Sequence, residues 1–426
     1  MKIHFIGIGG IGMSAIAQFF LSEGHEISGS DLAPSKVTDL LTSKGIKIFF
    51  GHSTENLPDD AKLAIYTTAI DSKNPELEKA RQLNIKTVSY AEALGMISSG
   101  KFTIAVAGTH GKTTTTAMIA KVMVDAGLSP TVIAGSILSD FGSNFFLGAS
   151  QNFLVEACEY RRTFLHLNPN ILVITNIEAD HLDYYTDLSD IQNAFLELAK
   201  KLAKDDFLIC NINDPNLELI IDNPEIECNI VDYHSLKAEM PSLKVPGRHN
   251  EENAKAALAV AAVFEISGEE AKKSLENFQG TWRRLERRGE TDKGAIVYDD
   301  YAHHPTEIRA SVLSLRETFP DKKIIVAFQP HLYSRTKFFL EEFGKSFADV
   351  EEVIVAPIYG AREEIDPSVS NEKLAFEIRK RGQKSTAIND FGEIAQYLLE
   401  NFDNQYVIVT MGAGDIYKVT EKISAK

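Results

Sequence analysis

The chain has 426 residues, of which 44% are hydrophobic and 24% charged, a composition typical of a globular protein whose length predicts two or three domains. Its formal net charge of −16 argues against nucleic acid as the main partner, because binding to a phosphate backbone depends on Lys and Arg that displace counterions. The three cysteines are too few and too scattered for a disulfide framework or a structural zinc site.

The first hundred residues alternate short apolar runs with helical patterns. Strands are predicted at 2–8, 25–31, 47–51 and 61–69, and helices at 12–24 and 36–45. Helices of this length between strands imply crossover connections and a parallel sheet covered on both faces. The opening "MKIHFIGIGGIGMS" reads as a strand that enters a helix rather than as a signal peptide, and no apolar run reaches about eighteen residues. We therefore expect a cytoplasmic protein without a membrane partner.

A glycine-rich loop follows the first predicted strand. Its fingerprint is GxGxxG, and an acidic residue ends the next strand; the residues concerned are Gly7, Gly9, Gly10, Gly12 and Asp31. Glycines let a backbone approach a diphosphate, and the N-terminus of the following helix supplies N–H groups. The loop is consistent with NAD or FAD, with another diphosphate-linked nucleoside, or with a tight turn alone. Asp31 either binds a ribose or is a solvated strand end.

A second glycine-rich loop, "GTHGKTT", joins a predicted strand at 101–109 to a predicted helix at 111–127. It is shorter than the full Walker pattern but keeps the context and the parts of a P-loop. Backbone N–H groups would surround phosphates, Lys112 would reach the terminal phosphate, and Thr113 would hold Mg²⁺. ATP is therefore the predicted ligand, held by residues Gly108, Thr109, His110, Gly111, Lys112, Thr113 and Thr114.

Carboxylates follow two further strands of this second region, predicted at 153–158 and 170–177. The groups are Glu156 and Glu159 at the end of the first strand, and Glu178, Asp180, His181 and Asp183 after the second. Ligands of open parallel sheets bind at the carboxyl ends of strands, and Mg²⁺ needs hard oxygen ligands beyond one hydroxyl. The joint placement favours a metal site, although any single carboxylate could be a solvated or capping group.

A third series begins after 279–294, which is polar and cationic and is predicted to be a linker. Strands are predicted at 295–302, 322–330, 351–359 and 405–414, each followed by a helical pattern. We therefore expect an α/β protein of three domains, with ranges 1–100, 101–285 and 286–426.

Six motifs, in this order behind "HFIGIGGIGMS", resemble those of the Mur ligase family: "GTHGKTTTT", "ACEYRRTFL", "TNIEADHLDYY", "VPGRHNEENA", "DDYAHHPTE" and "FQPHLYSRT". The resemblance covers essentially the whole chain and is strongest to members that join L-alanine to UDP-N-acetylmuramate in peptidoglycan precursor synthesis. It implies a Rossmann-like UDP-binding domain, a central P-loop ATPase domain and a C-terminal Rossmann-like domain. One glycine loop would then hold the UDP-sugar and the other ATP.

The resemblance also implies the chemistry. ATP would phosphorylate the substrate carboxylate, and the amine would attack the acyl phosphate and release phosphate. Lys112 and one or two Mg²⁺ ions would neutralise the charge that accumulates. Thr113 and Glu156 would bind the metal beside ATP, and His181 would bind a second metal or help to remove a proton from the attacking ammonium group.

Further binding roles are implied in the same way. Adenosine and its phosphates would be bound by Asn253, by Arg283 or Arg284, and by Asp300; the L-alanine carboxylate would be bound by His331 and Arg335. From the residues alone, Asn253 could equally be an N-terminal residue of the apolar helix that begins there. His303 and His304 could shape the amino-acid site or play a packed, structural role.

Three other functions remain open. A ligase that attaches a recycled L-Ala-γ-D-Glu-diaminopimelate tripeptide to the same UDP-sugar shares nearly every motif. An NAD-dependent oxidoreductase would explain the first glycine loop but not the second. A non-catalytic Mur-like protein would be expected to lose Lys112, Glu156 or His181, and all three are present. Many relatives read EADES or EADEY where this chain reads "EACEY", so Cys158 is taken as a tolerated variant and not a nucleophile.

Overall fold

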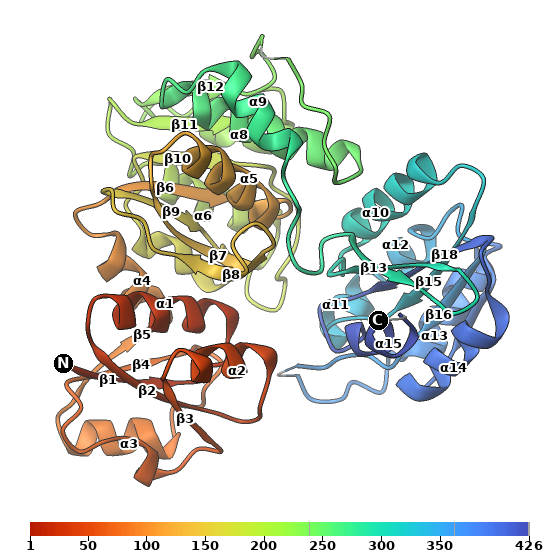
Figure 1. The fold of residues 1–426 in the computed structure, drawn as a ribbon, viewed down its shortest axis with the longest axis horizontal. Coiled ribbons are helices and arrows are strands. Elements are labelled where there is room, and N and C mark those ends of the chain that lie inside the picture. Colours follow the sequence, from red (N-terminus) through yellow and green to blue (C-terminus); the bar gives the residue numbers. More distant parts are fainter. Residues whose placement is uncertain (238, 362, 425–426) are drawn as a thin grey trace. The chain divides into compact units, whose positions relative to one another are not determined.

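The computed structural model describes residues 1–237, 239–361 and 363–424. The fold is α/β, with three separate sheets of mostly parallel strands (Figure 1). The chain divides into two compact units: an N-terminal unit of Met1–Ala179, Leu188–Pro241 and Asn253–Leu275, and a C-terminal unit of Asp180–Asp187, Ser242–Glu252 and Glu276–Lys426. The first two sheets lie in the N-terminal unit and the third in the C-terminal unit.

The first sheet is wholly parallel, in the order β3-β2-β1-β4-β5. Its strands are β1 (Lys2–Ile6), β2 (Glu26–Asp31), β3 (Lys47–Phe50), β4 (Leu63–Tyr66) and β5 (Lys86–Ser89). Its helices are α1 (Ile11–Ser22), α2 (Lys36–Ser43), the 3₁₀ turn η1 (Thr54–Asn56), α3 (Pro75–Gln82) and α4 (Tyr90–Ser98). The strand order reverses beside β1, and crevices at such switch points bind ligands in open sheets.

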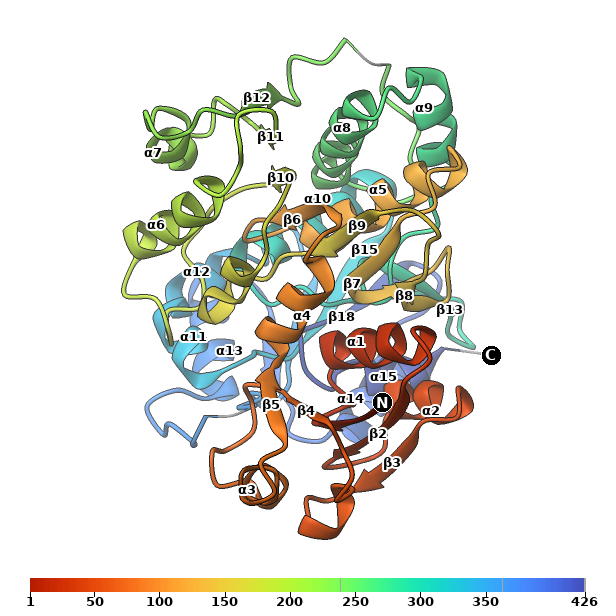
Figure 2. The same cartoon turned by 90° about the vertical axis from the view of Figure 1, so that its left-hand side faces the viewer.

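Helix α1 is buried along most of its length because both of its faces are covered. It lies against the first sheet and also beside β7 and β8 of the second sheet, as Figures 1 and 2 both show. Between them, Asn144 donates to the Ser14 hydroxyl at 3.0 Å and accepts from the Gln18 amide at 3.2 Å. These contacts provide hydrogen-bond partners for Ser14 and Gln18, two polar residues of a mostly apolar helix.

The second sheet has the order β12-β11-β10-β6-β9-β7-β8, parallel except for the edge strand β8. Its strands are β6 (Phe102–Ala107), β7 (Thr131–Leu138), β8 (Ser143–Phe146), β9 (Asn152–Glu156), β10 (Ile171–Ile174), β11 (Phe207–Cys210) and β12 (Asn229–Asp232). The connecting helices are α5 (Lys112–Asp125), η2 (Tyr160–His166), α6 (Leu188–Ala199), η3 (Pro215–Leu217), α7 (Glu218–Ile221), α8 (Arg248–Val263) and α9 (Gly268–Glu276). The central strand β6 lies between β9 and β10, so the loops after these three strands meet at one edge.

The third sheet has the order β13-β14-β18-β15-β16-β17. Its strands are β13 (Glu286–Glu290), β14 (Ile296–Asp300), β15 (Lys323–Phe328), β16 (Glu352–Val355), β17 (Ser385–Ala387) and β18 (Tyr406–Met411). Its helices are α10 (Pro305–Thr318), α11 (Tyr333–Phe338), α12 (Leu340–Lys345), α13 (Asn371–Lys380), α14 (Phe391–Asn401) and α15 (Tyr417–Ile423). Alternate residues of β15 enter two separate hydrophobic clusters, one on each face of the sheet.

The predicted linker at 279–294 is wrong in part, because Glu286–Glu290 forms β13, which pairs antiparallel with β14. Edge strands tolerate charged residues, and one side of this strand has no neighbour in the sheet. Its composition therefore resembled that of a linker. Along the described stretches, no helix combines the length and the apolar character needed to cross a bilayer.

Candidate active site

The first glycine loop runs from β1 into α1 and is braced by the acidic residue at the end of β2. Gly7 has a φ of +82°, and the Gly9 N–H donates to Oδ2 of Asp31 at 2.7 Å. A Cβ on Gly9 would lie 2.8 Å from that oxygen, and one on Gly12 would lie 2.7 Å from the Tyr90 ring. The two glycines therefore allow close approaches that a side chain would block. Asp31 is a partner of the loop as well as a candidate ribose ligand.

The second glycine loop, between β6 and α5, has a left-handed backbone at both glycines. Gly108 has a φ of +138° and Gly111 of +82°, and a Cβ on Gly108 would lie 2.0 Å from the Thr175 hydroxyl. Asn176, which follows β10, holds the loop: its carbonyl accepts from the Thr109 N–H and its side chain from the His110 N–H, both at 3.0 Å. Sequence reasoning did not single out Asn176. Its position directly after a buried strand is the signal that could have found it.

Lys112, the first residue of α5, turns its ammonium group back onto the loop. Nζ donates to the Gly108 and Thr109 carbonyls and lies 3.0 Å from Glu159, whose side chain is 3% exposed. Burial acts to lower the pKa of Lys112, but the Glu159 carboxylate outweighs it and raises the pKa above its ordinary value. The loop therefore carries a fixed positive charge where a P-loop places its lysine.

Thr113 and Glu156 meet beside this lysine. The Thr113 hydroxyl donates to Oε1 of Glu156 at 3.0 Å, and the Gly135 N–H donates to Oε2 at 2.7 Å. A Cβ on Gly135 would lie 2.4 Å from Oε1, so the glycine makes room for the carboxylate. Hydroxyl and carboxylate oxygens are the ligands that Mg²⁺ prefers, and this pair fits the predicted metal. Thr114, the next predicted residue, is buried in the first turn of α5.

Asn253 lies against the same loop from α8. Its Oδ1 accepts from the Thr115 hydroxyl at 3.1 Å, and a Cβ on Gly111 would lie 2.5 Å from that oxygen. Helix α8 begins at Arg248, so the alternative of a helix N-terminal residue is wrong. The structure brings Asn253 to the start of α5, which is consistent with an adenosine contact.

Cys158 is expected to be chemically inert. Burial, and the nearby Glu159 carboxylate, raise the pKa of its thiol to about 12. A thiol, rather than a thiolate, is a poor nucleophile. We expect Cys158→Ala to keep the turnover of the unsubstituted chain within about twofold, and iodoacetamide at pH 7.5 to leave Cys158 unmodified in the native protein. Rapid labelling of Cys158 with loss of turnover, followed by mass spectrometry, would contradict this.

In the C-terminal unit, Asp180 and Arg335 form a buried ion pair. Nε and one terminal nitrogen of Arg335 lie 3.0 and 2.7 Å from Oδ1 of Asp180, and both side chains are less than a tenth exposed. Burial would raise the pKa of Asp180, but the Arg335 charge holds it well below its ordinary value. Nδ1 of His331 lies 3.0 Å from the third nitrogen of Arg335, and its ring stacks on Tyr359. The predicted amino-acid ligands His331 and Arg335 are thus brought together.

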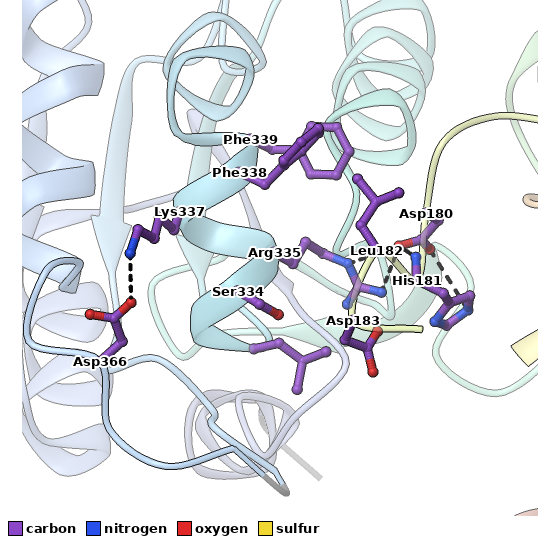
Figure 3. A pocket seen from close by; sticks show the side chains of 11 residues that line it. Asp180, His181, Leu182, Asp183, Ser334, Arg335, Lys337, Phe338, Phe339 and Asp366 are labelled. Carbon is purple, nitrogen blue, oxygen red and sulfur yellow. Dashed lines mark hydrogen bonds and ion pairs between the residues drawn. The ribbon is translucent and has the colours of Figure 1, made fainter. Parts of the chain in front are cut away.

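A pocket of about 420 Å³ opens beside this pair (Figure 3). Helix α11 supplies one wall, and the segment after Asp180 supplies the other; its lining is Asp180, His181, Leu182, Asp183, Leu332, Ser334, Arg335, Lys337, Phe338, Phe339 and Asp366. Figure 3 shows Arg335 directed toward Asp180, while Lys337 points away to Asp366. His181 has a φ of +53°, a left-handed backbone that is uncommon outside glycine. His181, a predicted site residue, lines the same pocket as Arg335.

His304 is the residue at the start of α10. It caps α10, with Nδ1 accepting from the Thr306 N–H at 3.3 Å, and its ring packs edge-on to Phe339. His303 donates from Nδ1 to the Tyr301 carbonyl at 3.0 Å, and burial lowers its pKa to about 4 although Glu307 opposes the shift.

The low pKa of His303 makes stability depend on pH. Above about pH 6.5 the ring is neutral in both the folded and the unfolded chain; as pH falls toward 4 only the unfolded chain binds the proton, so the free energy of unfolding decreases. We expect His303→Asn to lose less stability than the unsubstituted chain between pH 7 and 5, measured by urea unfolding. Exposed His234→Asn is the control. Equal losses in all three proteins would show that His303 does not titrate in this way.

The structure separates the two candidate arginines. Arg283 is 3% exposed and donates to Asp299 and to the carbonyls of Gly412 and Gly414. Arg284 keeps a partly exposed guanidinium 3.8 Å from Glu307, so it remains the candidate for a phosphate contact. Asp300, the candidate ribose ligand, is buried and accepts from the Ser311 hydroxyl.

Three models of one family match the chain in order. Residues 2–102 match the "Mur ligase family, catalytic domain", residues 106–240 the "Mur ligase middle domain", and residues 283–414 the "Mur ligase, glutamate ligase domain". The UDP-N-acetylmuramate–L-alanine ligase of Clostridium kluyveri is 42% identical over 99% of this chain and 97% of that protein. This chain belongs to the Mur ligase family. The predicted family is therefore confirmed.

Solved structures of other Mur ligases share the fold. UDP-N-acetylmuramate–alanine ligase MurC from Thermotoga maritima superposes with a TM-score of 0.83 at 29% identity, covering 99% of this chain and 98% of that one. A murein peptide ligase from Psychrobacter arcticus gives a TM-score of 0.75 at 22% identity with the same coverage, which shows the fold alone. The α/β fold of three Mur ligase domains, with Rossmann-like first and third domains, is confirmed. The individual site residues remain predictions.

Proposed function

We propose that this Mur ligase joins L-alanine to the carboxylate of UDP-N-acetylmuramate, with ATP converted to ADP and phosphate, to make a precursor of peptidoglycan. The observation that carries the proposal is the pair of glycine loops at the ends of β1 and β6, the second of which has a lysine, a threonine and a carboxylate clustered beside it. A sugar nucleotide and ATP need two such loops, and a simple dehydrogenase needs one. The Clostridium kluyveri relative, similar along nearly its whole length, is a UDP-N-acetylmuramate–L-alanine ligase.

The first step transfers the γ-phosphoryl group of ATP to the substrate carboxylate. Negative charge gathers on the phosphoryl oxygens next to an anion, so a fixed cation stabilises the transition state. Lys112 supplies that charge, and Asn176 and Glu159 hold the loop and the ammonium group in place. Thr113 and Glu156 would hold Mg²⁺, which adds further positive charge when bound. Asn253, Arg284 and Asp300 are proposed to bind the adenosine and phosphates.

The second step is attack of the L-alanine amine on the acyl phosphate. Two nitrogens of Arg335 already donate to Asp180, and the third lies beside Nδ1 of His331. We propose that the remaining N–H groups of this guanidinium, together with His331, bind the L-alanine carboxylate. An ammonium group must lose a proton before it attacks, and His181 is proposed to accept it or to bind a second metal. The tetrahedral intermediate then expels phosphate and leaves the amide.

The proposal is tested by measuring phosphate release with ATP, Mg²⁺ and UDP-N-acetylmuramate in the presence of different amines. Strong stimulation by L-alanine, with weaker stimulation by glycine and L-serine, is expected. Stimulation by the tripeptide L-Ala-γ-D-Glu-diaminopimelate instead would assign the chain to recycling. No release with any amine would contradict ligase activity and favour a binding role.

A further inference from the structure

Strand β8 holds the start of helix α1 through one buried amide (Figures 1 and 2). Asn144, which is 1% exposed, donates from Nδ2 to the Ile11 carbonyl at 2.5 Å and to the Ser14 hydroxyl at 3.0 Å. Its Oδ1 accepts from the Gln18 amide at 3.2 Å. Ser14 and Gln18 are buried as well. Asn144 therefore contacts the first two turns of α1, directly behind the first glycine loop.

The same hairpin also holds the predicted metal ligand. The pairing of β7 with β8 shifts its register between Ile133 and Leu138, which places a bulge opposite Asn144. Gly135 lies in this bulge, and its N–H donates to Oε2 of Glu156 at 2.7 Å. Bulges redirect the groups of a strand and are frequent beside active sites. One strand of the hairpin therefore holds α1, and the other holds the Glu156 carboxylate.

The proposed reaction depends on the spacing of the two glycine loops. The sugar nucleotide is bound at the first loop, but its carboxylate has to meet the phosphoryl group beside Lys112 and Glu156. Reacting atoms have to lie about 3–3.5 Å apart, and a misplacement of about 1 Å costs about a hundredfold in rate. The two loops belong to different sheets, so their spacing depends on contacts between those sheets. The hairpin of β7 and β8 supplies contacts of this kind.

We infer that Asn144 is a positioning residue that sets the spacing of the two glycine loops, and that the bulge in β7 links it to Glu156. An amide suits this place because it donates and accepts at once. The start of α1 offers it two acceptors, the Ile11 carbonyl and the Ser14 hydroxyl, and the Gln18 amide offers it a donor. The inference rests on the proposed function, which assigns the two loops to one reaction.

The first experiment separates the rate from the two affinities. Asn144→Ala should lower kcat for phosphate release by about ten- to a hundredfold at saturating ATP, UDP-N-acetylmuramate and L-alanine. The Kd of UDP and the Kd of ADP with Mg²⁺, measured by calorimetry, should stay within about threefold, because each loop keeps its own residues. A merely structural role would lower thermal stability without this division between kcat and the two Kd values.

The second experiment isolates the first step. ATP with oxygen-18 between its β and γ phosphorus atoms is mixed with UDP-N-acetylmuramate, without an amine. Transfer of the γ-phosphoryl group to the carboxylate leaves the label on the β-phosphate of ADP, where rotation and reversal of the transfer move it to a non-bridging position of ATP. We expect this exchange to slow in Asn144→Ala by at least the factor seen in kcat.

Asn170→Ala is the matched control. Asn170 accepts from the Thr103 N–H and donates to Asp206, both at 3.0 Å. It precedes β10, at the edge of the second sheet opposite the second glycine loop. Its replacement should lower thermal stability, because it removes hydrogen bonds of the same kind, and leave kcat and the oxygen exchange unchanged.

Gln18→Ala tests the contact from the side of α1. Because Gln18 and Asn144 act through one contact, the double variant should be no slower than the slower single variant. If Asn144→Ala does not fold, Gln18→Ala decides alone, and it should lower kcat with both Kd values unchanged.

Unchanged oxygen exchange in Asn144→Ala would overturn the inference, and so would an equal loss in Asn170→Ala. If the unsubstituted chain shows neither phosphate release nor oxygen exchange, the proposed function fails instead. The two failures are therefore distinguishable.

Discussion

Replacing Lys112 by alanine is expected to lower ATP-dependent phosphate release by a factor of about a hundred to a thousand, the usual cost of losing one fixed charge or donor at a transition state. The ammonium group lies on the loop carbonyls and is held there by Glu159. UDP binding should stay within about threefold, because the first glycine loop belongs to a different sheet. Steady-state kinetics and UDP calorimetry measure the two effects. Equal loss of both would contradict the assignment of separate roles to the two loops.

Lys112→Ala is also expected to lower the stability of the protein. Removing Lys112 leaves the buried Glu159 carboxylate without its cation, and an unpaired buried charge is destabilising. The double variant Lys112→Ala with Glu159→Gln should recover thermal stability but not turnover. Lys121→Ala, on the same helix and paired with Asp125 one turn away, is the matched control and should keep near-normal rates.

Of the substitutions proposed for this chain, Arg335→Ala is expected to lower the free energy of unfolding the most. Removing one partner of a buried ion pair costs about 3–5 kcal/mol, because the Asp180 carboxylate is left buried and unpaired. Adding Asp180→Ala should restore much of that loss. If Arg335 also binds the amino acid, the KM for L-alanine should stay high in the double variant while the KM for ATP is unchanged. Urea unfolding and steady-state kinetics separate the two roles.

The same helix offers a matched control for this pair. Lys337 and Asp366 form an ion pair at 3.0 Å with a lysine side chain that is 59% exposed, and such pairs contribute about 0–1 kcal/mol. Lys337→Ala should therefore change the urea midpoint little. If Lys337→Ala lowered the urea midpoint as much as Arg335→Ala does, burial of the ion pair could not explain the loss of stability in Arg335→Ala.

Local patterns were enough to predict much of the fold. Parallel strands buried on both faces, such as β6 and β10, appear in the sequence as continuous apolar runs, and glycines mark the turns that follow β1 and β6. The charged edge strand β13 could not be found in this way, because its pairing with β14 is tertiary. Local patterns also could not assign the segment 180–187. It follows a strand of the second sheet in sequence, but it belongs to the C-terminal unit.

The candidate site was predicted where one motif supplies all the parts. Lys112 and Thr113 lie within a single loop, so their meeting follows from local spacing. Asn176 and Asp180 have partners that are far away in the sequence: Asn176 braces the loop after β6, and Asp180 pairs with Arg335 of α11. Their position after β10 marks both as candidates, but the local sequence does not identify the partner of either. Glu76 also shows the limit of local sequence. The segment "NPELEK" is typical of the exposed start of a helix, but the Glu76 side chain, in the first turn of α3, is fully buried.

The most direct test of the ligase chemistry follows the oxygen atoms of the UDP-N-acetylmuramate carboxylate. With that carboxylate labelled with oxygen-18 and with ATP and L-alanine present, each phosphate released should carry one labelled oxygen, since the acyl phosphate oxygen leaves with phosphorus when the amine attacks. The other label should remain in the amide carbonyl of the product. Unlabelled phosphate, with both labels retained in the sugar nucleotide, would contradict an acyl phosphate intermediate and with it the proposed reaction.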